Sequence, residues 1–197
     1  MSASTAKMTQ TKSFAFIGIS VALLAVSAWF TIPLGPVPIT LQVFVYVFLI
    51  VALPKKEALG AIALYVAMGT AGLPVFSSMR GGISVVAGPT GGFLWGAILA
   101  AVAAVLVIAM LQKFTKANSN NEQVGSLSIK SWVYFVASFV FLAVLYLAGW
   151  AQLMYVAHLD AASAFAAGVA PFILIDLFKI IAAVFVATGF KKAFKGK

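Results

Sequence analysis

The sequence predicts an all-α integral membrane protein with six transmembrane helices and both termini in the cytoplasm. Three observations support this fold class: the composition, the recurring apolar runs, and the placement of the basic residues. Of the 197 residues, 63% are apolar and 9% are charged, whereas a soluble domain is usually about 45–50% apolar and about 25% charged. Apolar runs of about 20 residues, the length that crosses a ~30 Å hydrocarbon core, recur along the chain. The composition therefore excludes a soluble domain and a disordered chain.

Six apolar segments are expected to cross the membrane. Residues 1–12 are predicted to form a cytoplasmic tail, residues 13–190 a single membrane domain, and residues 191–197 a basic cytoplasmic tail. The first span should end at the proline cluster of residues 33–38, because proline cannot continue a helix. The predicted spans are residues 13–32, 39–53, 58–73, 93–111, 132–156 and 163–190.

The basic residues fall unevenly on the two sides of this predicted bundle. Six spans put both termini on one side, which then carries eleven of the thirteen lysines and arginines, whereas the opposite loops carry only Arg80. Because cytoplasmic loops are enriched in Lys and Arg, this asymmetry predicts cytoplasmic termini. The net charge of +9 is then explained by basic residues that face the anionic lipid headgroups of the cytoplasmic side. No nucleic-acid partner is therefore expected. The eleven are Lys7, Lys12, Lys55, Lys56, Lys113, Lys116, Lys130, Lys191, Lys192, Lys195 and Lys197.

The outer loops are unusually apolar for segments exposed to water. Residues 33–38 are proline-rich and uncharged, and residues 73–92 are long, apolar and rich in glycine. Irregular backbone at membrane depth occurs only where protein buries it or where it lines a cavity. Two interpretations remain open, a packed structural cap and a wall over a ligand cavity. Residues 88–92 lack the Gly-Lys-Ser/Thr ending of a phosphate-binding loop, so the chain is not expected to hydrolyse ATP itself.

Two ionisable residues lie inside the predicted sixth span. Asp176 and Lys179 are three positions apart and therefore share one helix face. Ionisable groups inside a bilayer cost several kcal/mol each and usually face the bundle interior. The pair could be a self-contained ion pair that fixes helix packing. Alternatively, with Arg80 closing the site from the loop above, it could receive a small amphiphile that carries an N–H group, a carbonyl and an acid.

No other residues suggest catalysis or metal binding. His158 is the only histidine, at a predicted helix end, and the chain has no cysteine, so no transition-metal site or enzymatic nucleophile is expected. Small residues form a stripe along the first predicted helix, and such stripes let helices approach closely in lipid. This stripe, which could face another subunit, comprises Ala15, Gly18, Ala22 and Ala25.

Five motifs resemble the BioY family, in the same order along the chain. They are residues 36–42 (PVPITLQ), 72–76 (GLPVF), 80–82 (RGG), 88–92 (GPTGG) and 176–179 (DLFK). BioY proteins are the biotin-binding S components of energy-coupling factor (ECF) transporters. The resemblance implies a six-helix bundle in the cytoplasmic membrane of a prokaryote. It implies biotin as ligand, no cofactor, and as partners a transmembrane coupling subunit and ABC-type ATPases.

The resemblance also implies roles for particular residues. Asp176 and Lys179 would contact the biotin head group, and the first-helix stripe would meet the coupling subunit. The outer loops would supply Arg80 and the turn at residues 88–92, with Gln42 at the inner end of the proline-rich loop. Apolar side chains would pack on the ring and acyl chain. The expected ligand-binding residues are Asp176, Lys179, Arg80, Gln42, Tyr65, Phe76, Gly88, Thr90, Gly91 and Trp95.

Two other functions remain open from the sequence. A self-contained biotin facilitator, acting as an oligomer, would carry the same binding residues without a partner ATPase. An intramembrane enzyme or a purely structural membrane protein is the third alternative.

Overall fold

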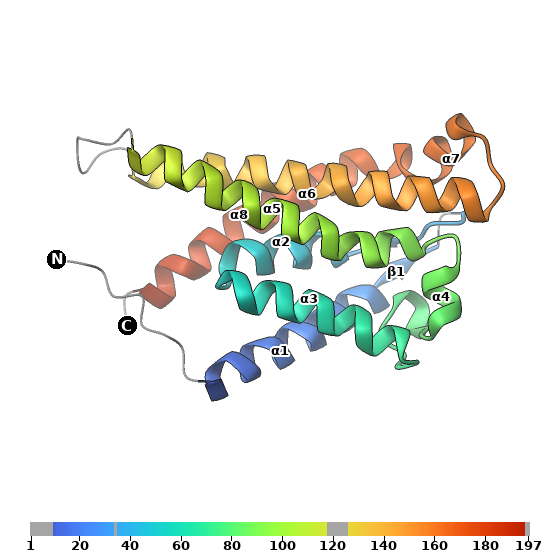
Figure 1. The fold of residues 1–197 in the computed structure, drawn as a ribbon, viewed down its shortest axis with the longest axis horizontal. Coiled ribbons are helices and arrows are strands. Elements are labelled where there is room, and N and C mark those ends of the chain that lie inside the picture. Colours follow the sequence, from blue (N-terminus) through green and yellow to red (C-terminus); the bar gives the residue numbers. More distant parts are fainter. Residues whose placement is uncertain (1–9, 34, 118–125, 196–197) are drawn as a thin grey trace.

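The protein is a bundle of helices that run roughly along one axis (Figure 1). The computed structural model describes residues 10–33, 35–117 and 126–195. Its α-helices are α1 (Gln10–Trp29), α2 (Gln42–Ala52), α3 (Lys55–Thr70), α4 (Ile83–Ala87), α5 (Gly91–Ala117), α6 (Ser126–Val156), α7 (Ala161–Gly168) and α8 (Ile173–Lys195). Two short strands, β1 (Thr31–Ile32) and β2 (Ile39–Thr40), and two 3-10 turns, Ser77–Met79 and Ala170–Phe172, complete the described elements.

Four segments of the described chain are long and apolar enough to cross a membrane, namely Gln10–Trp29, Gly91–Phe114, Ser131–Val156 and Ala161–Ala193. The apolar helical fold is therefore confirmed. The helix α2 has 11 residues and α3 has 16. At 1.5 Å per residue they rise about 16 and 24 Å, less than a ~30 Å hydrocarbon core. Six spans with cytoplasmic termini thus stay a prediction.

The predicted sixth span is not one continuous helix. Residues 163–190 are divided into α7, a 3-10 turn at Ala170–Phe172, and α8. Pro171 lies in this turn and explains the break, because its ring lacks an N–H group and clashes with the preceding helical turn. As a result Asp176 falls in the first turn of α8, next to the irregular segments at that end of the bundle.

The first predicted span also ends earlier than expected, at Trp29 rather than at residue 32. The chain continues into an antiparallel hairpin in which Thr31 pairs with Thr40 and Ile32 pairs with Ile39. The proline-rich loop is thus the tip of a hairpin, and it returns the chain to the start of α2.

The helices pack as pairs, with α5 beside α6, α2 beside α8 and α1 beside α3. Glycine allows the closest of these approaches: a Cβ added at Gly92 or Gly96 would collide with Ala148 of α6. The helix α2 is buried along most of its length, so it forms the centre of the bundle. Large apolar side chains such as Phe178 and Phe185 of α8 are exposed, 74% and 65% respectively, as suits a lipid-facing surface.

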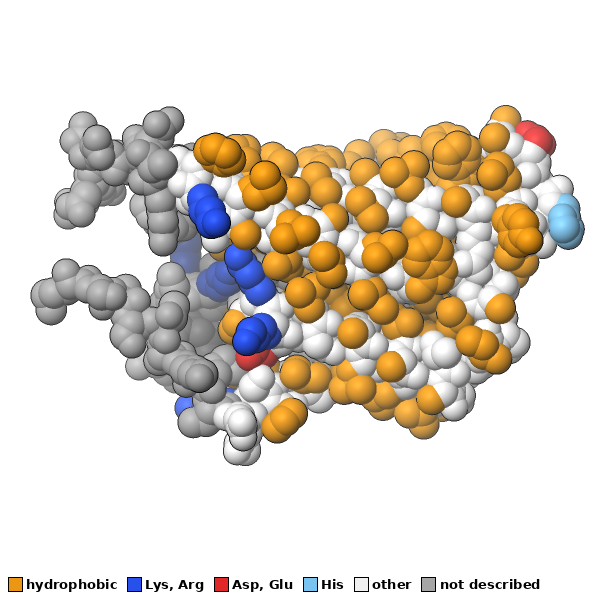
Figure 2. Space-filling model, in the orientation of Figure 1, with side chains coloured by type: hydrophobic (Ala, Val, Ile, Leu, Met, Phe, Trp, Pro, Cys, Tyr) orange, Lys and Arg blue, Asp and Glu red, His pale blue; other side chains and the backbone are white. Residues whose placement is uncertain are grey.

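The two ends of the bundle differ in chemistry. Apart from Lys179, the lysines whose side chains the structure describes gather at the end where α1 begins and α8 ends (Figure 2). We call the half that contains this end the inner half. The outer half carries the hairpin, α4 and α7 (Figure 1). Lys7 and Lys197 of the predicted cytoplasmic set lie outside the described residues, as do residues 1–9 of the predicted tail.

Candidate ligand-binding site

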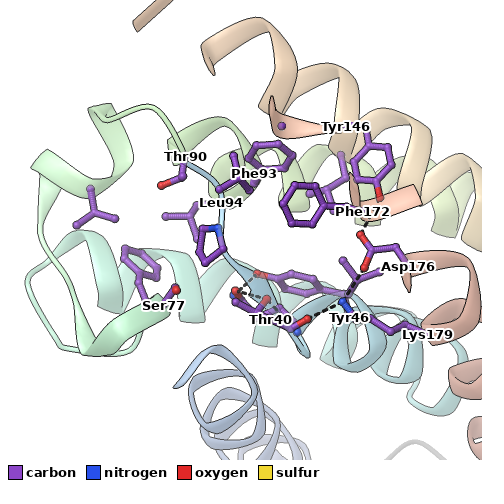
Figure 3. A pocket seen from close by; sticks show the side chains of 18 of the residues that line it. Thr40, Tyr46, Ser77, Thr90, Phe93, Leu94, Tyr146, Phe172, Asp176 and Lys179 are labelled. Carbon is purple, nitrogen blue, oxygen red and sulfur yellow. Dashed lines mark hydrogen bonds and ion pairs between the residues drawn. The ribbon is translucent and has the colours of Figure 1, made fainter. Parts of the chain in front are cut away.

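The outer half of the bundle encloses a cavity of about 90 Å³, several times the ~10–15 Å³ that one water molecule needs. Helices α2, α5, α6 and α8, the hairpin and residues 76–90 all contribute to its lining (Figure 3). The polar lining residues are Thr40, Gln42, Tyr46, Ser77, Arg80, Thr90, Tyr146, Asp176 and Lys179. The apolar ones include Val37, Val43, Phe76, Val85, Phe93, Leu94, Leu145 and Phe172. Most of the accessible lining surface is apolar, and polar groups converge on it from several elements, which is typical of a small-molecule site.

An ion pair from α8 lies at one end of this cavity. The ammonium of Lys179 is 2.7 Å from Oδ1 of Asp176, and it also donates to the main-chain carbonyl of Thr40 at 2.7 Å. The hydroxyl of Tyr146 donates to Oδ2 of Asp176 at 2.8 Å. Asp176 is 4% exposed, so it is fixed from both sides by partners on α8 and α6.

The pair still has hydrogen-bonding capacity for a ligand. A carboxylate offers about four lone-pair sites and an ammonium three N–H groups. Asp176 uses two of these sites on Lys179 and Tyr146, and Lys179 uses two of its N–H groups on Asp176 and Thr40. About two lone-pair sites and one N–H group therefore remain on two side chains that both line the cavity. They match a group that presents an N–H and a C=O on one edge, as a cyclic amide or urea does.

A second polar network is centred on Gln42, which lines the cavity, and extends behind the lining to Tyr65. The amide nitrogen of Gln42 donates to the hydroxyls of Tyr65 (2.9 Å) and Tyr46 (3.3 Å). Its amide oxygen accepts from Thr40 Oγ1 at 3.1 Å, and Tyr65 donates to the carbonyl of Val75 at 3.0 Å. The network therefore joins the hairpin, α2, α3 and the chain that follows α3.

Residues 77–90, which we call the outer wall, cover the cavity at its exposed end. Arg80 is exposed and donates through Nε to the carbonyl of Ser77 at 3.3 Å. Just before the wall, Phe76 is 1% exposed, and its ring meets that of Tyr65 edge to face, with 5.6 Å between centroids. The outer wall thus contributes the cation of Arg80 to the cavity lining, and the ring of Phe76 lines the cavity just before the wall begins.

The structure brings six of the ten predicted ligand-binding residues into the lining: Asp176, Lys179, Arg80, Gln42, Phe76 and Thr90. Tyr65, Gly88, Gly91 and Trp95 lie outside it. Tyr65 supports Gln42 from behind, and Trp95 is 38% exposed and donates to Gln152. Gly88 and Gly91 stand at the end of the outer wall, where Gly91 permits close packing of Val86.

Sequence reasoning missed three groups that shape the site. Tyr146 and the carbonyl of Thr40 hold the ion pair, and Gln152 bonds to the outer wall. Tyr146 and Gln152 are polar residues inside the predicted fifth span, six positions apart, and that placement was the available signal. A main-chain acceptor such as Thr40 has no signature in side-chain chemistry.

The small-residue stripe of α1 is divided between two environments. Ala15, Gly18 and Ala22 are exposed, whereas Ala25 is 6% exposed and belongs to the core. A Cβ added at Gly18 would have no atom within 4 Å. The exposed part therefore leaves room for another helix.

The chain resembles proteins of known family. It matches the BioY family over residues 1–196. It is 39% identical over 176 residues to "Biotin transporter BioY" of Thermotoga maritima, covering 89% of this chain and 93% of that protein. It is 32% identical to "Probable biotin transporter BioY" of Pyrococcus horikoshii, over 89% and 94% of the two chains. A crystal structure described as the S-component for biotin from an ECF-type ABC transporter superposes with a TM-score of 0.75, 21% identity and 94% and 95% coverage.

Proposed function

Because the chain belongs to the BioY family, we propose that it binds biotin from the outer side and carries it across the cytoplasmic membrane of a prokaryote. It would act as the S component of an ECF transporter, with a coupling subunit and ABC-type ATPases as partners. The observation that carries the proposal is the Asp176–Lys179 ion pair, in which Asp176 is buried. Both residues line the cavity, and both keep hydrogen-bonding groups free.

The head group of biotin fits this pair chemically. Its ureido ring presents an N–H next to a C=O, so the N–H can donate to Asp176 while the carbonyl accepts from Lys179. Bonds to ionised groups are shorter and roughly twice as strong as those between neutral groups. Tyr146 and Thr40 would keep both side chains in position for these bonds.

The rest of the ligand fits the path from the pair to the outer wall. The thiophane ring and acyl chain are apolar and would pack among Phe93, Leu94 and Phe172, which line the space between the two polar ends of the cavity (Figure 3). Arg80 at the mouth would receive the carboxylate. The ligand would therefore lie head inward and acid outward.

Calorimetric titration of the detergent-purified protein tests the proposal. Biotin should bind, whereas lipoate, which shares the five-carbon acid chain and lacks the ureido group, should not. Biotin methyl ester should bind more weakly than biotin, because the ester removes the charge that would meet Arg80. If lipoate and biotin bind with equal affinity, the Asp176–Lys179 pair does not recognise the ureido group.

The exposed stripe of α1 leaves a second candidate open, a stand-alone facilitator whose copies meet through that stripe. Gly18→Leu fills the open surface at Gly18. In an S component, this variant should still bind biotin and should lose co-purification with the coupling subunit and two ATPases. Uptake of biotin by the purified wild-type chain in liposomes would favour the facilitator.

A further inference from the structure

The outer wall depends on hydrogen bonds for its position. None of the side chains of residues 77–90 is buried, and Val85 and Val86 are half-buried against the core. The wall nevertheless supplies four lining residues, which are Ser77, Arg80, Val85 and Thr90. Since little apolar surface anchors it, its polar contacts determine how firmly the cavity is closed.

The beginning of the wall is held through main-chain groups. The N–H of Phe76 donates to the carbonyl of Arg80 at 2.9 Å, and the N–H of Gly82 donates to the carbonyl of Gly69 in α3 at 2.6 Å. The first bond closes the segment 76–80 on itself, and the second ties Gly82 to α3. Neither bond reaches the second half of the wall.

The side chain of Gln152 from α6 holds that second half. Its amide nitrogen donates to the carbonyls of Val86 (2.8 Å) and Gly88 (2.7 Å). Its amide oxygen accepts from the indole N–H of Trp95 at 2.6 Å, which fixes the orientation of the amide. The two bonded carbonyls lie between Val85 and Thr90, two of the lining residues of the wall.

The glycines that follow the wall make this contact sterically possible. A Cβ at Gly91 would collide with the carbonyl of Val86 and approach the Gln152 amide nitrogen, and a Cβ at Gly92 would approach the Gln152 side chain. Two adjacent positions therefore leave room for the same amide. The glycine pair and the three hydrogen bonds are independent observations that point to one contact.

We infer that Gln152 is a positioning residue that holds the outer wall closed and thereby sets how slowly a bound ligand leaves. The inference rests on the proposed function for the identity of the ligand, biotin. Gln152 does not line the cavity, so it acts through Val85 and Thr90. We expect its loss to be seen in dissociation, because the wall lines the cavity and would restrain a bound ligand.

Gln152→Glu tests this with little change in shape. A carboxylate can still accept from Trp95, but it cannot donate to the two carbonyls. The matched control is Trp150→Phe, which removes a bond from α6 to the carbonyl of Ala161 (3.0 Å) at the start of α7 and leaves the wall untouched. Two quantities are measured for wild type and both variants: biotin association and dissociation rates, and amide hydrogen exchange of residues 83–90 in the ligand-free protein.

The expected result is a dissociation rate about tenfold higher in Gln152→Glu, the order of effect of losing two hydrogen bonds. The association rate should not fall, because a wall that is loosened in the ligand-free protein also opens more readily to an entering ligand. Amide exchange of residues 83–90 should accelerate while the thermal midpoint of the whole protein stays unchanged. Trp150→Phe should match wild type in both rates and in this exchange.

Two outcomes would overturn the inference. If Gln152→Glu releases biotin at the wild-type rate, the hydrogen bonds of Gln152 do not control ligand release. If Trp150→Phe raises the dissociation rate equally, the effect comes from the general packing of α6. If the wild type binds no biotin, the proposed function is wrong. The exchange of residues 83–90 then decides independently whether Gln152 holds the wall.

Discussion

The inner and outer halves of the bundle use similar apolar residues in different ways. In the inner half α5, α6 and α8 run without interruption, and polar contacts such as the bond from Ser13 to Glu57 (2.9 Å) tie neighbouring helices at their ends. The outer half contains the hairpin, both 3-10 turns and the short helices α4 and α7. Irregular backbone is tolerated at membrane depth where it is buried in protein or lines a cavity. The candidate site therefore lies in the half of the bundle where the helices are interrupted by irregular backbone.

The largest expected effect is on biotin affinity, when one negative charge is removed in the outer half and, as a control, in the inner half. Asp176→Asn should weaken biotin binding at least about 100-fold, because a charge-assisted acceptor becomes neutral while the side chain keeps its shape. The matched change in the inner half, Glu57→Gln, should leave affinity unchanged. Calorimetric titration measures both, and gel filtration checks folding. An unchanged affinity in Asp176→Asn would exclude Asp176 from the site.

A pair of glycine substitutions gives the next largest contrast. A methyl added in Gly69→Ala would collide with the ring of Phe76, whereas one added in Gly18→Ala would meet no atom within 4 Å. We expect Gly69→Ala to cost about 1–3 kcal/mol of stability, as overpacked cores do, and to lower biotin affinity because Phe76 lines the cavity. Gly18→Ala should change neither. Thermal unfolding and titration measure both effects, and equal stability of the two variants would contradict the packing at Gly69.

A smaller effect is expected from the network behind the cavity. Tyr65→Phe leaves the amide nitrogen of Gln42 and the carbonyl of Val75 each short of one partner. Buried groups without partners cost about 1–3 kcal/mol of stability. Biotin affinity should fall about tenfold, because Gln42 lines the cavity and loses a bond that fixes its amide. Tyr134→Phe, which removes the acceptor of Lys191 in the inner half, is the control and should bind biotin as wild type does. If wild type, Tyr65→Phe and Tyr134→Phe bind biotin equally well, the hydrogen-bond network of Gln42 does not contribute to biotin binding.

The smallest effect is expected at Asp160, which caps α7 by accepting from the N–H groups of Ala162 (3.0 Å) and Ser163 (3.1 Å). Hydrogen bonds from Ser163 and Ala162 hold the pKa of this exposed carboxyl below its ordinary value of 3.8. A lowered pKa means that the stabilisation is complete above pH 3.8 and is lost as the pH falls through the folded-state pKa.

Asp160→Ala should therefore lower the thermal midpoint slightly at neutral pH, with unchanged biotin affinity. The difference from wild type should disappear in acid. Thermal scans of both proteins at several pH values measure it, and a difference that persists at low pH would rule out the carboxylate cap.

The sequence predicted the long helices better than the breaks between them. Apolar runs located α5 and α6, since apolarity and length decide whether a segment can cross a membrane. The same criterion hid the break at Pro171, because residues on both sides of it are apolar. The hairpin of residues 31–40 was missed for a related reason, since its first strand continues the apolar run of α1.

The sequence pointed to the candidate site where its polar groups are close together along the chain. Asp176 and Lys179 stand out because two charges three positions apart inside a span require an explanation. Their partners Tyr146 and Thr40 lie 30 and 139 positions away, and only the fold brings them together. Trp95 was predicted to contact the ligand, but the side of α5 that it occupies could be learned only from the packing against α6.

The shortness of α2 has a consequence for transport. This helix begins at the cavity with Gln42 and ends after 11 residues, just before the lysine pair at residues 55 and 56. It therefore forms a plug about 16 Å deep, roughly half of a ~30 Å hydrocarbon core. In the proposed function, biotin seated against Asp176 would therefore have about half of the hydrocarbon core still to cross, along the depth that α2 closes.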